Sequence, residues 1–173
     1  MTNQEADQLL RRLRWTLGAF LVGLVLSGLT AFPLEQELDI LVKIRGLDGG
    51  VSSVNASGLD HWILTVRDGL HDAYGRYPWL AYGTDWLAFA HLVIAVFFIG
   101  VFVDPVRNVW VVQAGLIACA LVIPLALICG PLRGIPFGWR LIDCSFGVFG
   151  AIPLWICLRW IRRLEELQRL PPR

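Results

Sequence analysis

Residues 84–103 read TDWLAFAHLVIAVFFIGVFV, an apolar run that would extend about 30 Å as one helix, enough to cross a bilayer. His91 is the ionisable side chain that lies well inside this run. A polar group in hydrocarbon must find a partner, and ionisable residues kept there commonly serve a function. The stretch therefore predicts a membrane-spanning helix and makes His91 a candidate site residue.

The composition of the whole chain also indicates a membrane protein. Of its 173 residues, 56% are hydrophobic, and the mean hydropathy is +0.61. An ordinary soluble domain is less apolar. A formal net charge of +1 gives no general attraction to nucleic acid. We therefore expect a single domain over residues 1–173 that contacts the lipid bilayer and binds no nucleic acid.

Three further apolar runs predict three more spans, and hence an all-α integral membrane protein with a four-transmembrane-helix bundle. The four spans are expected at about 15–32, 84–103, 109–129 and 139–158. Residues 34–83 form an outer insertion with two amphipathic helices, one from Leu34 to about Gly46 and one from Leu59 to Tyr74. Both helices are too short to span, so we expect them on the extracytoplasmic surface of the bilayer. Residues 159–173 form a basic cytoplasmic tail.

The distribution of arginine predicts the orientation. If the amino terminus is cytoplasmic, Arg133 and Arg140 lie in the short outer loop, and nine arginines lie on the inner side: Arg11, Arg12, Arg14, Arg107, Arg159, Arg162, Arg163, Arg169 and Arg173. Cytoplasmic loops of membrane proteins are enriched in basic residues. We therefore expect a multi-pass protein with both termini in the cytoplasm, in a bacterial inner membrane.

Small residues recur every four positions on the first span. Ala19, Gly23, Ser27 and Ala31 form one narrow stripe. Small side chains allow membrane helices to approach closely, which is how such helices pack when water gives no hydrophobic drive between them. The stripe predicts a packing interface for another helix, either of this chain or of a separate membrane subunit.

A polar pocket in the outer leaflet is predicted around His91. Thr84, Ala88 and Ala95 share its helix face, so His91 should pack against another helix. If the second and fourth spans are neighbours, His91 and Asp143 meet, with Arg140 and Asp85 close by. A histidine and a carboxylate in low dielectric can relay protons or orient a ligand. In the alternative reading, His91 bonds a backbone carbonyl and Asp143 pairs with Arg140.

The surroundings of His91 also raise the question of a cofactor. Residues 88–95, AFAHLVIA, resemble the membrane-helix histidine with small neighbours that ligates magnesium in light-harvesting polypeptides or iron in membrane cytochromes. The resemblance implies haem or (bacterio)chlorophyll bound through His91, although Leu87 stands where the antenna pattern prefers alanine. No other span carries a histidine for a second axial ligand. Absence of a cofactor is the main expectation.

Two weaker patterns concern metals and cysteines. His61, Asp68 and Asp72 fall on one face of the second amphipathic helix and could hold a divalent metal. The same pattern is typical of the solvent-exposed polar face of an interfacial helix. This is the favoured interpretation, so no metal is expected. Cys129 and Cys144 flank the short outer turn, where a disulfide or two free thiols are both compatible with the spacing.

The sequence contains no nucleophilic triad, phosphate-binding glycine loop, H-E-x-x-H motif or paired-carboxylate motif. An enzyme is therefore not the main expectation. We expect a non-enzymatic accessory or scaffold subunit of a larger membrane complex, of a respiratory or photosynthetic kind. The alternative is a small membrane carrier, enzyme or tetrapyrrole-binding protein that uses the pocket around His91 and Asp143.

Overall fold

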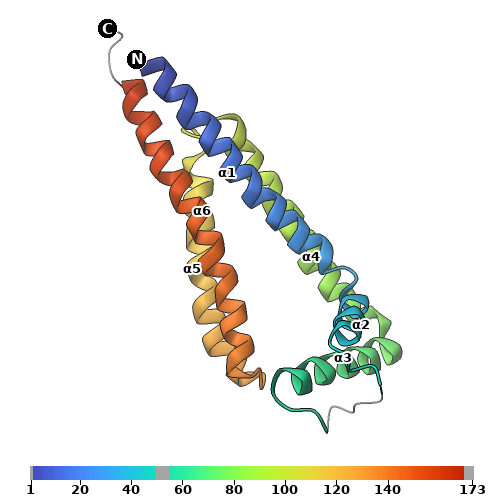
Figure 1. The fold of residues 1–173 in the computed structure, drawn as a ribbon. Helices are drawn as coiled ribbons and strands as arrows, with labels where there is room; N and C mark the ends of the chain where they lie inside the picture. Colours follow the sequence, from blue (N-terminus) through green and yellow to red (C-terminus); the bar gives the residue numbers. More distant parts are fainter. Residues whose placement is uncertain (1, 50–54, 170–173) are drawn as a thin grey trace. The chain divides into compact units, whose positions relative to one another are not determined.

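The computed structural model describes residues 2–49 and 55–169, and every regular element in these residues is helical. Figure 1 shows the order of the elements, which are α1 (Thr2–Thr30), α2 (Leu34–Ile44), α3 (Gly58–Arg76), the short η2 (Pro78–Leu80), α4 (Ala81–Val103), α5 (Val109–Leu132) and α6 (Phe137–Arg169). The predicted all-α class is confirmed. The last four residues of the predicted basic tail and part of the loop between α2 and α3 lie outside the described residues.

Four helical stretches are long and apolar enough to cross a membrane: Gln4–Thr30, Pro78–Val103, Val109–Leu132 and Phe137–Arg169. The predicted number of spans is therefore confirmed at the level of length and composition. Large apolar side chains cover the outside of these helices, for example Leu121, 60% exposed, and Phe149, 70% exposed. Outward-facing apolar side chains are stable in contact with lipid, so the chain has the surface of a membrane protein.

Two of these helices extend beyond the predicted membrane spans. The polar arm before residue 15 joins the first span in one helix of 29 residues, and α6 runs 33 residues into the basic tail. Between Thr2 and Arg14 no Pro or Gly interrupts the helix. Leu9 and Leu10 pack beside Leu13, so this arm shares the core of the protein.

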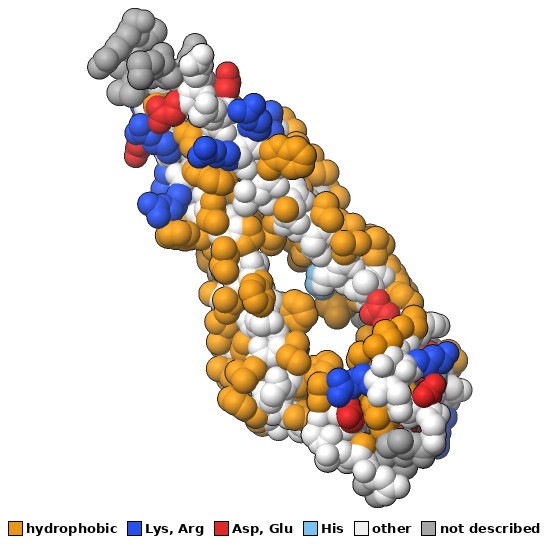
Figure 2. All heavy atoms as spheres, viewed as in Figure 1, with side chains coloured by type: hydrophobic (Ala, Val, Ile, Leu, Met, Phe, Trp, Pro, Cys, Tyr) orange, Lys and Arg blue, Asp and Glu red, His pale blue; other side chains and the backbone are white. Residues whose placement is uncertain are grey.

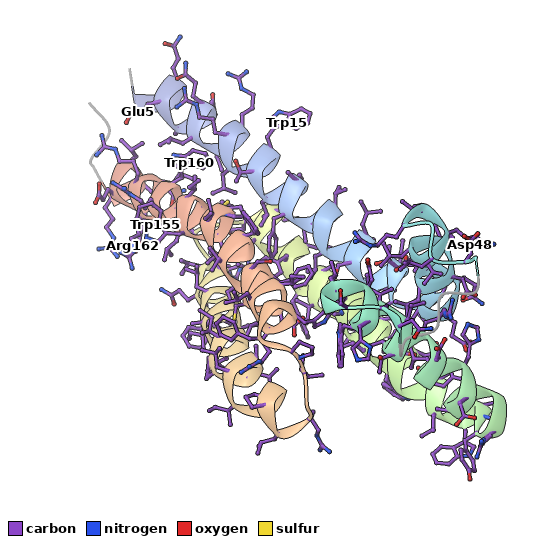
Figure 3. The ribbon with its side chains drawn as sticks, turned by 60° about the horizontal axis from the view of Figure 1, so that its bottom comes forward. Glu5, Trp15, Asp48, Trp155, Trp160 and Arg162 are labelled. Carbon is purple, nitrogen blue, oxygen red and sulfur yellow. The ribbon has the colours of Figure 1, made fainter. Side chains whose placement is uncertain are left out.

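The chain forms two compact units, one of residues 1–23 and 94–173 and one of residues 24–93. In the first unit the core joins the N-terminal half of α1, the end of α4, the start of α5 and the C-terminal half of α6. Leu13, Leu17 and Leu154 are 0% exposed in it. Trp160 points toward α1, whereas Trp15 points away from α6 (Figure 3).

Within this unit α5 and α6 lie antiparallel and side by side (Figure 1). Gly147 permits their close approach, because a Cβ there would lie 2.5 Å from the backbone oxygen of Cys119. A tight turn joins the two helices: the Ile135 amide donates to the Gly130 carbonyl at 2.9 Å. Gly134 has φ +70°, a left-handed conformation that favours glycine.

The second unit contains the packed pair α2 and α3. Leu38 and Val42 of α2 and Ile63 and Leu64 of α3 are buried. Arg45 donates to the Asp60 carboxylate at 2.5 Å, and this hydrogen bond raises the pKa of the Arg45 guanidinium. The segment between the first two candidate spans is therefore helical, and its helices α2 and α3 pack on each other.

Charged side chains gather in separate places on each unit (Figure 2). In the first unit they cover the neighbouring ends of α1 and α6, where Arg163 pairs with Glu5 at 3.1 Å. In the second unit they cover α2 and α3. Hydrophobic side chains cover the spans themselves, a distribution that suits helices crossing hydrocarbon between polar ends.

Candidate functional site

His91 of α4 is held by its own helix. Its Nδ1 lies 2.8 Å from the carbonyl oxygen of Leu87, one turn earlier. Because a carbonyl oxygen only accepts, Nδ1 must donate, and the neutral ring then carries its lone pair on Nε2. This bond to a backbone carbonyl is the simpler of the two arrangements expected from the sequence. It also leaves Nε2 as the nitrogen that could accept a proton or ligate a metal.

Gly28 of α1 is the residue against which His91 packs. A Cβ at Gly28 would lie 2.8 Å from the Cβ of His91 and 3.0 Å from the carbonyl oxygen of Ala88. Ala88 is 0% exposed, so the two helix backbones nearly touch here. The predicted small-residue seam around His91 does pack against a helix. Its partner residue, Gly28, lies one position away from the stripe singled out in the sequence.

Arg140 and Asp143 occupy the first turns of α6. The stem of Arg140 lies on Gly130, and its guanidinium lies 5.2 Å from the centroid of the Phe137 ring. Nε of Arg140 is buried without a hydrogen-bond partner. Asp143 forms no ion pair with Arg140 or any other residue that the structure describes. The predicted pairing of these two residues is therefore absent.

His91 and Asp85 belong to the unit of residues 24–93, whereas Arg140 and Asp143 belong to the other unit. The structure describes each unit by itself, so the pocket predicted from all four residues stays a prediction. Asp85 itself lines a hollow of about 220 Å³ together with Phe32, Tyr82, Trp86 and Phe89. Trp86 stands edge to face with Tyr82 and with Phe89, each at 5.9 Å between ring centroids. Trp and Tyr side chains are enriched at the headgroup level of a bilayer, so this aromatic cluster suits that position.

The stripe on α1 faces outward. Ala19, Gly23 and Ser27 are exposed and Ala31 is partly exposed. A Cβ at Gly23 would meet nothing within 4 Å. The chain packs α1 through another face instead, on which Leu13, Leu17 and Gly28 are buried. Most of this face is therefore exposed in the part of the chain that the structure describes.

The two carboxylates among the candidate metal ligands of α3 form ion pairs with neighbouring arginines. Asp68 pairs with Arg67 at 2.6 Å and Asp72 with Arg76 at 2.9 Å. The carbonyl of His61 accepts a hydrogen bond from the Thr65 hydroxyl at 2.7 Å. Among the described residues no group of three or more His, Cys, Asp or Glu side chains could hold a metal ion. The geometry favours the solvated helix face that the sequence also allowed.

His71 makes contacts that sequence reasoning missed. Its Nε2 lies 3.1 Å from Asp39 and its Nδ1 lies 3.5 Å from Glu35, both on α2. The two carboxylates are four residues apart and thus share a helix face, which was the available signal. Because they face opposite nitrogens of one ring, they tie α2 to α3 when the ring is protonated and do not converge on a common metal position.

All four cysteines are free: Cys119, Cys129, Cys144 and Cys157. The disulfide that the spacing of Cys129 and Cys144 allowed is not formed. Cys157 is fully buried, and its thiol lies 3.9 Å from the Leu13 carbonyl oxygen. Cys119 and Cys157 act as small apolar side chains in the helix contacts.

The arrangement as a whole defines a small helical membrane protein with four candidate spans. No protein-family model, curated protein or solved structure matched the chain. Two features of the described residues bear on its function. One is the face of α1 formed by Ala19, Gly23, Ser27 and Ala31, and the other is His91 at its contact with Gly28.

Proposed function

We propose that the protein is a non-enzymatic scaffold subunit of a larger membrane complex. It binds a partner helix through the small-residue face of α1, formed by Ala19, Gly23, Ser27 and Ala31. The single observation that carries the proposal is Gly23, where an added Cβ would meet no neighbour within 4 Å.

Three other glycines of the spans give the contrast, although Gly83 and Gly138, near the starts of α4 and α6, are as open as Gly23. Gly28 faces His91, Gly115 faces Leu154, and Gly147 faces Cys119, each at less than 3.0 Å from an added Cβ. These three serve contacts inside the chain. A glycine inside a helix lowers helix stability by about 1 kcal/mol relative to alanine. At Gly23 no internal contact offsets this cost, whereas close approach of a partner helix would.

The test compares variants in the native membrane. Gly23→Leu and Ser27→Leu should each release a defined membrane partner, seen as a smaller complex on native electrophoresis. Ala120→Leu, at an exposed position of α5, is the matched control and should leave the complex intact. A wild-type protein that migrates as a monomer, or a complex indifferent to Gly23→Leu, contradicts the proposal.

The proposed setting is a bacterial inner membrane, with both termini in the cytoplasm and α2 and α3 on the outer surface. The arginine distribution supports this orientation. An epitope inserted after Asn55 should be cleaved by protease added to spheroplasts, and an epitope after Arg173 only in inverted vesicles. The reverse pattern would contradict the orientation.

A second candidate function is supported by the bond from His91 to Leu87. By fixing the hydrogen on Nδ1, this bond leaves Nε2 free for ligation of a tetrapyrrole or for proton transfer, the arrangement that metal-ligating histidines usually have. The purified protein should then show a haem or bacteriochlorin absorption band that His91→Ala removes and His61→Ala preserves. A colourless wild-type protein from native membrane contradicts the tetrapyrrole form. A respiratory or photosynthetic complex is the setting in which such a band is expected.

A further inference from the structure

A long groove runs along α1 in the unit of residues 1–23 and 94–173. It has a volume of about 870 Å³ and is lined by α1 residues from Asp7 to Val22 and by Phe102 of α4. Gly18 carries no side chain to cover Phe102, whose ring lies 3.9 Å from the place of a Cβ. The ring thus forms the floor of an apolar channel, with Trp15, 78% exposed, and Val22, 59% exposed, at its rim.

The end of this groove nearest the start of α1 carries two arginines on one helix face. Nε of Arg14 donates to the carbonyl oxygen of Phe102 at 3.2 Å, and its guanidinium lies 5.9 Å from the centroid of the Phe102 ring. These contacts position the side chain and leave its terminal N–H groups for another acceptor. Arg11, three residues earlier, makes no ion pair with a residue that the structure describes. Two guanidinium groups at this spacing suit a phosphate.

Asp7 lies one turn beyond Arg11 and also lines the groove. Along the helix, from its end toward the middle, the groove therefore offers a carboxylate, two guanidinium groups and then an apolar channel. An aminophospholipid presents its groups in the same order: an ammonium, a phosphate two carbons away, and then acyl chains. From Arg14 to Val22 the channel is about 12 Å long, which accommodates part of an acyl chain.

We propose that this groove binds phosphatidylethanolamine. The phosphate lies on Arg11 and Arg14, the ammonium faces Asp7, and one acyl chain lies over Gly18 against Phe102. A phospholipid whose headgroup lacks an ammonium leaves Asp7 without a counterion next to the phosphate. Ala19 borders both this groove and the small-residue face of α1, but Gly23, Ser27 and Ala31 do not line the groove. A partner protein helix laid in the groove itself would leave both arginines and Asp7 unmatched. The lipid satisfies all three charges at once.

The experiment measures which lipid stays on the protein. Full-length protein in detergent is equilibrated with vesicles of equal phosphatidylethanolamine and phosphatidylglycerol content, repurified, and analysed by native mass spectrometry. Wild type should retain one phosphatidylethanolamine in preference to phosphatidylglycerol. Arg11→Gln should lower its retention by up to about fivefold, the size of an exposed charge pair. Asp7→Asn should remove the preference between the lipids, and Gly18→Leu should displace both.

Arg12→Gln is the matched control, because Arg12 is exposed on the same stretch and does not line the groove. It should leave lipid retention at the wild-type level. The proposal is overturned if wild type retains the two lipids equally, if Asp7→Asn keeps the preference, or if Arg12→Gln acts like Arg11→Gln. Co-purification of a protein in place of the lipid, released by Gly18→Leu, would also overturn it. Circular dichroism checks that each variant keeps its helical content.

Discussion

Replacing Gly147 by alanine should loosen the contact between α5 and α6. The added Cβ would lie 2.5 Å from the backbone oxygen of Cys119, whereas ordinary contacts between carbon and oxygen are about 3.3 Å or longer. One helix must therefore move by about 0.8 Å, and a backbone atom cannot rotate away as a side chain can. Overpacking of this kind typically lowers stability by about 1–3 kcal/mol. The gain in helix propensity, about 1 kcal/mol, partly offsets the loss.

A matched substitution isolates the packing effect. Gly23→Ala adds the same methyl group to a helix interior with no neighbour within 4 Å, so it brings the propensity gain alone. Unfolding of both purified variants in mixed micelles with increasing denaturing detergent gives the two free energies. We expect Gly147→Ala to be less stable than Gly23→Ala by about 1–3 kcal/mol. Equal stability of the two variants would refute the close approach of α5 and α6 at Gly147.

Three further predictions follow from the structure. Leu17→Ala, at a position 0% exposed, should lower the free energy of unfolding by about 2–5 kcal/mol, measured in the same detergent titration. Arg45→Met should speed amide exchange in α2 at low salt but not at high salt. The raised pKa of Arg45 means that its pair with Asp60 is fully present below the ordinary arginine pKa and lost only above the raised one, so the effect should not change between about pH 7 and 10. Alkylation of the denatured protein without reductant should label all four cysteines; two labels would reveal a bridge.

The number and positions of the spans follow from the lengths of the apolar runs, because a run of about 20 apolar residues has few alternatives to a membrane helix. The spacing of Leu9, Leu10 and Leu13 indicates that a helix can start in the polar arm and run into the first span, and α1 does begin at Thr2. What the sequence did not show is that α6 would extend equally far and cover those leucines.

The site was predicted in part. Bonding of His91 to a backbone carbonyl was foreseen, because the only requirement is a carbonyl one turn away. Gly28 was missed as its packing partner because Ser27 and Gly28 are both small. Which of two adjacent small residues faces a neighbour depends on the rotation of the helix, and the spacing of small residues does not determine that rotation. The pairing of His71 with Glu35 and Asp39 depends on how α2 crosses α3, which no local pattern encodes.

The core that joins α1 to α6 has a consequence for biosynthesis. Leu13 and Leu17 lie on α1, which is synthesised before α4 and α5, whereas their neighbours Leu154, Ile161 and Leu164 lie on α6, which is synthesised after them. A helix with its backbone hydrogen bonds satisfied is stable in lipid by itself. α1 can therefore remain in the membrane before the helices that pack on it are inserted. α4 covers part of the α1 face, for example where Phe98 packs on Phe20, but the part that α6 covers stays open until α6 is inserted. A nascent chain that stops before Phe137 therefore lacks the α6 side chains that complete this core, even though α4 and α5 are already present.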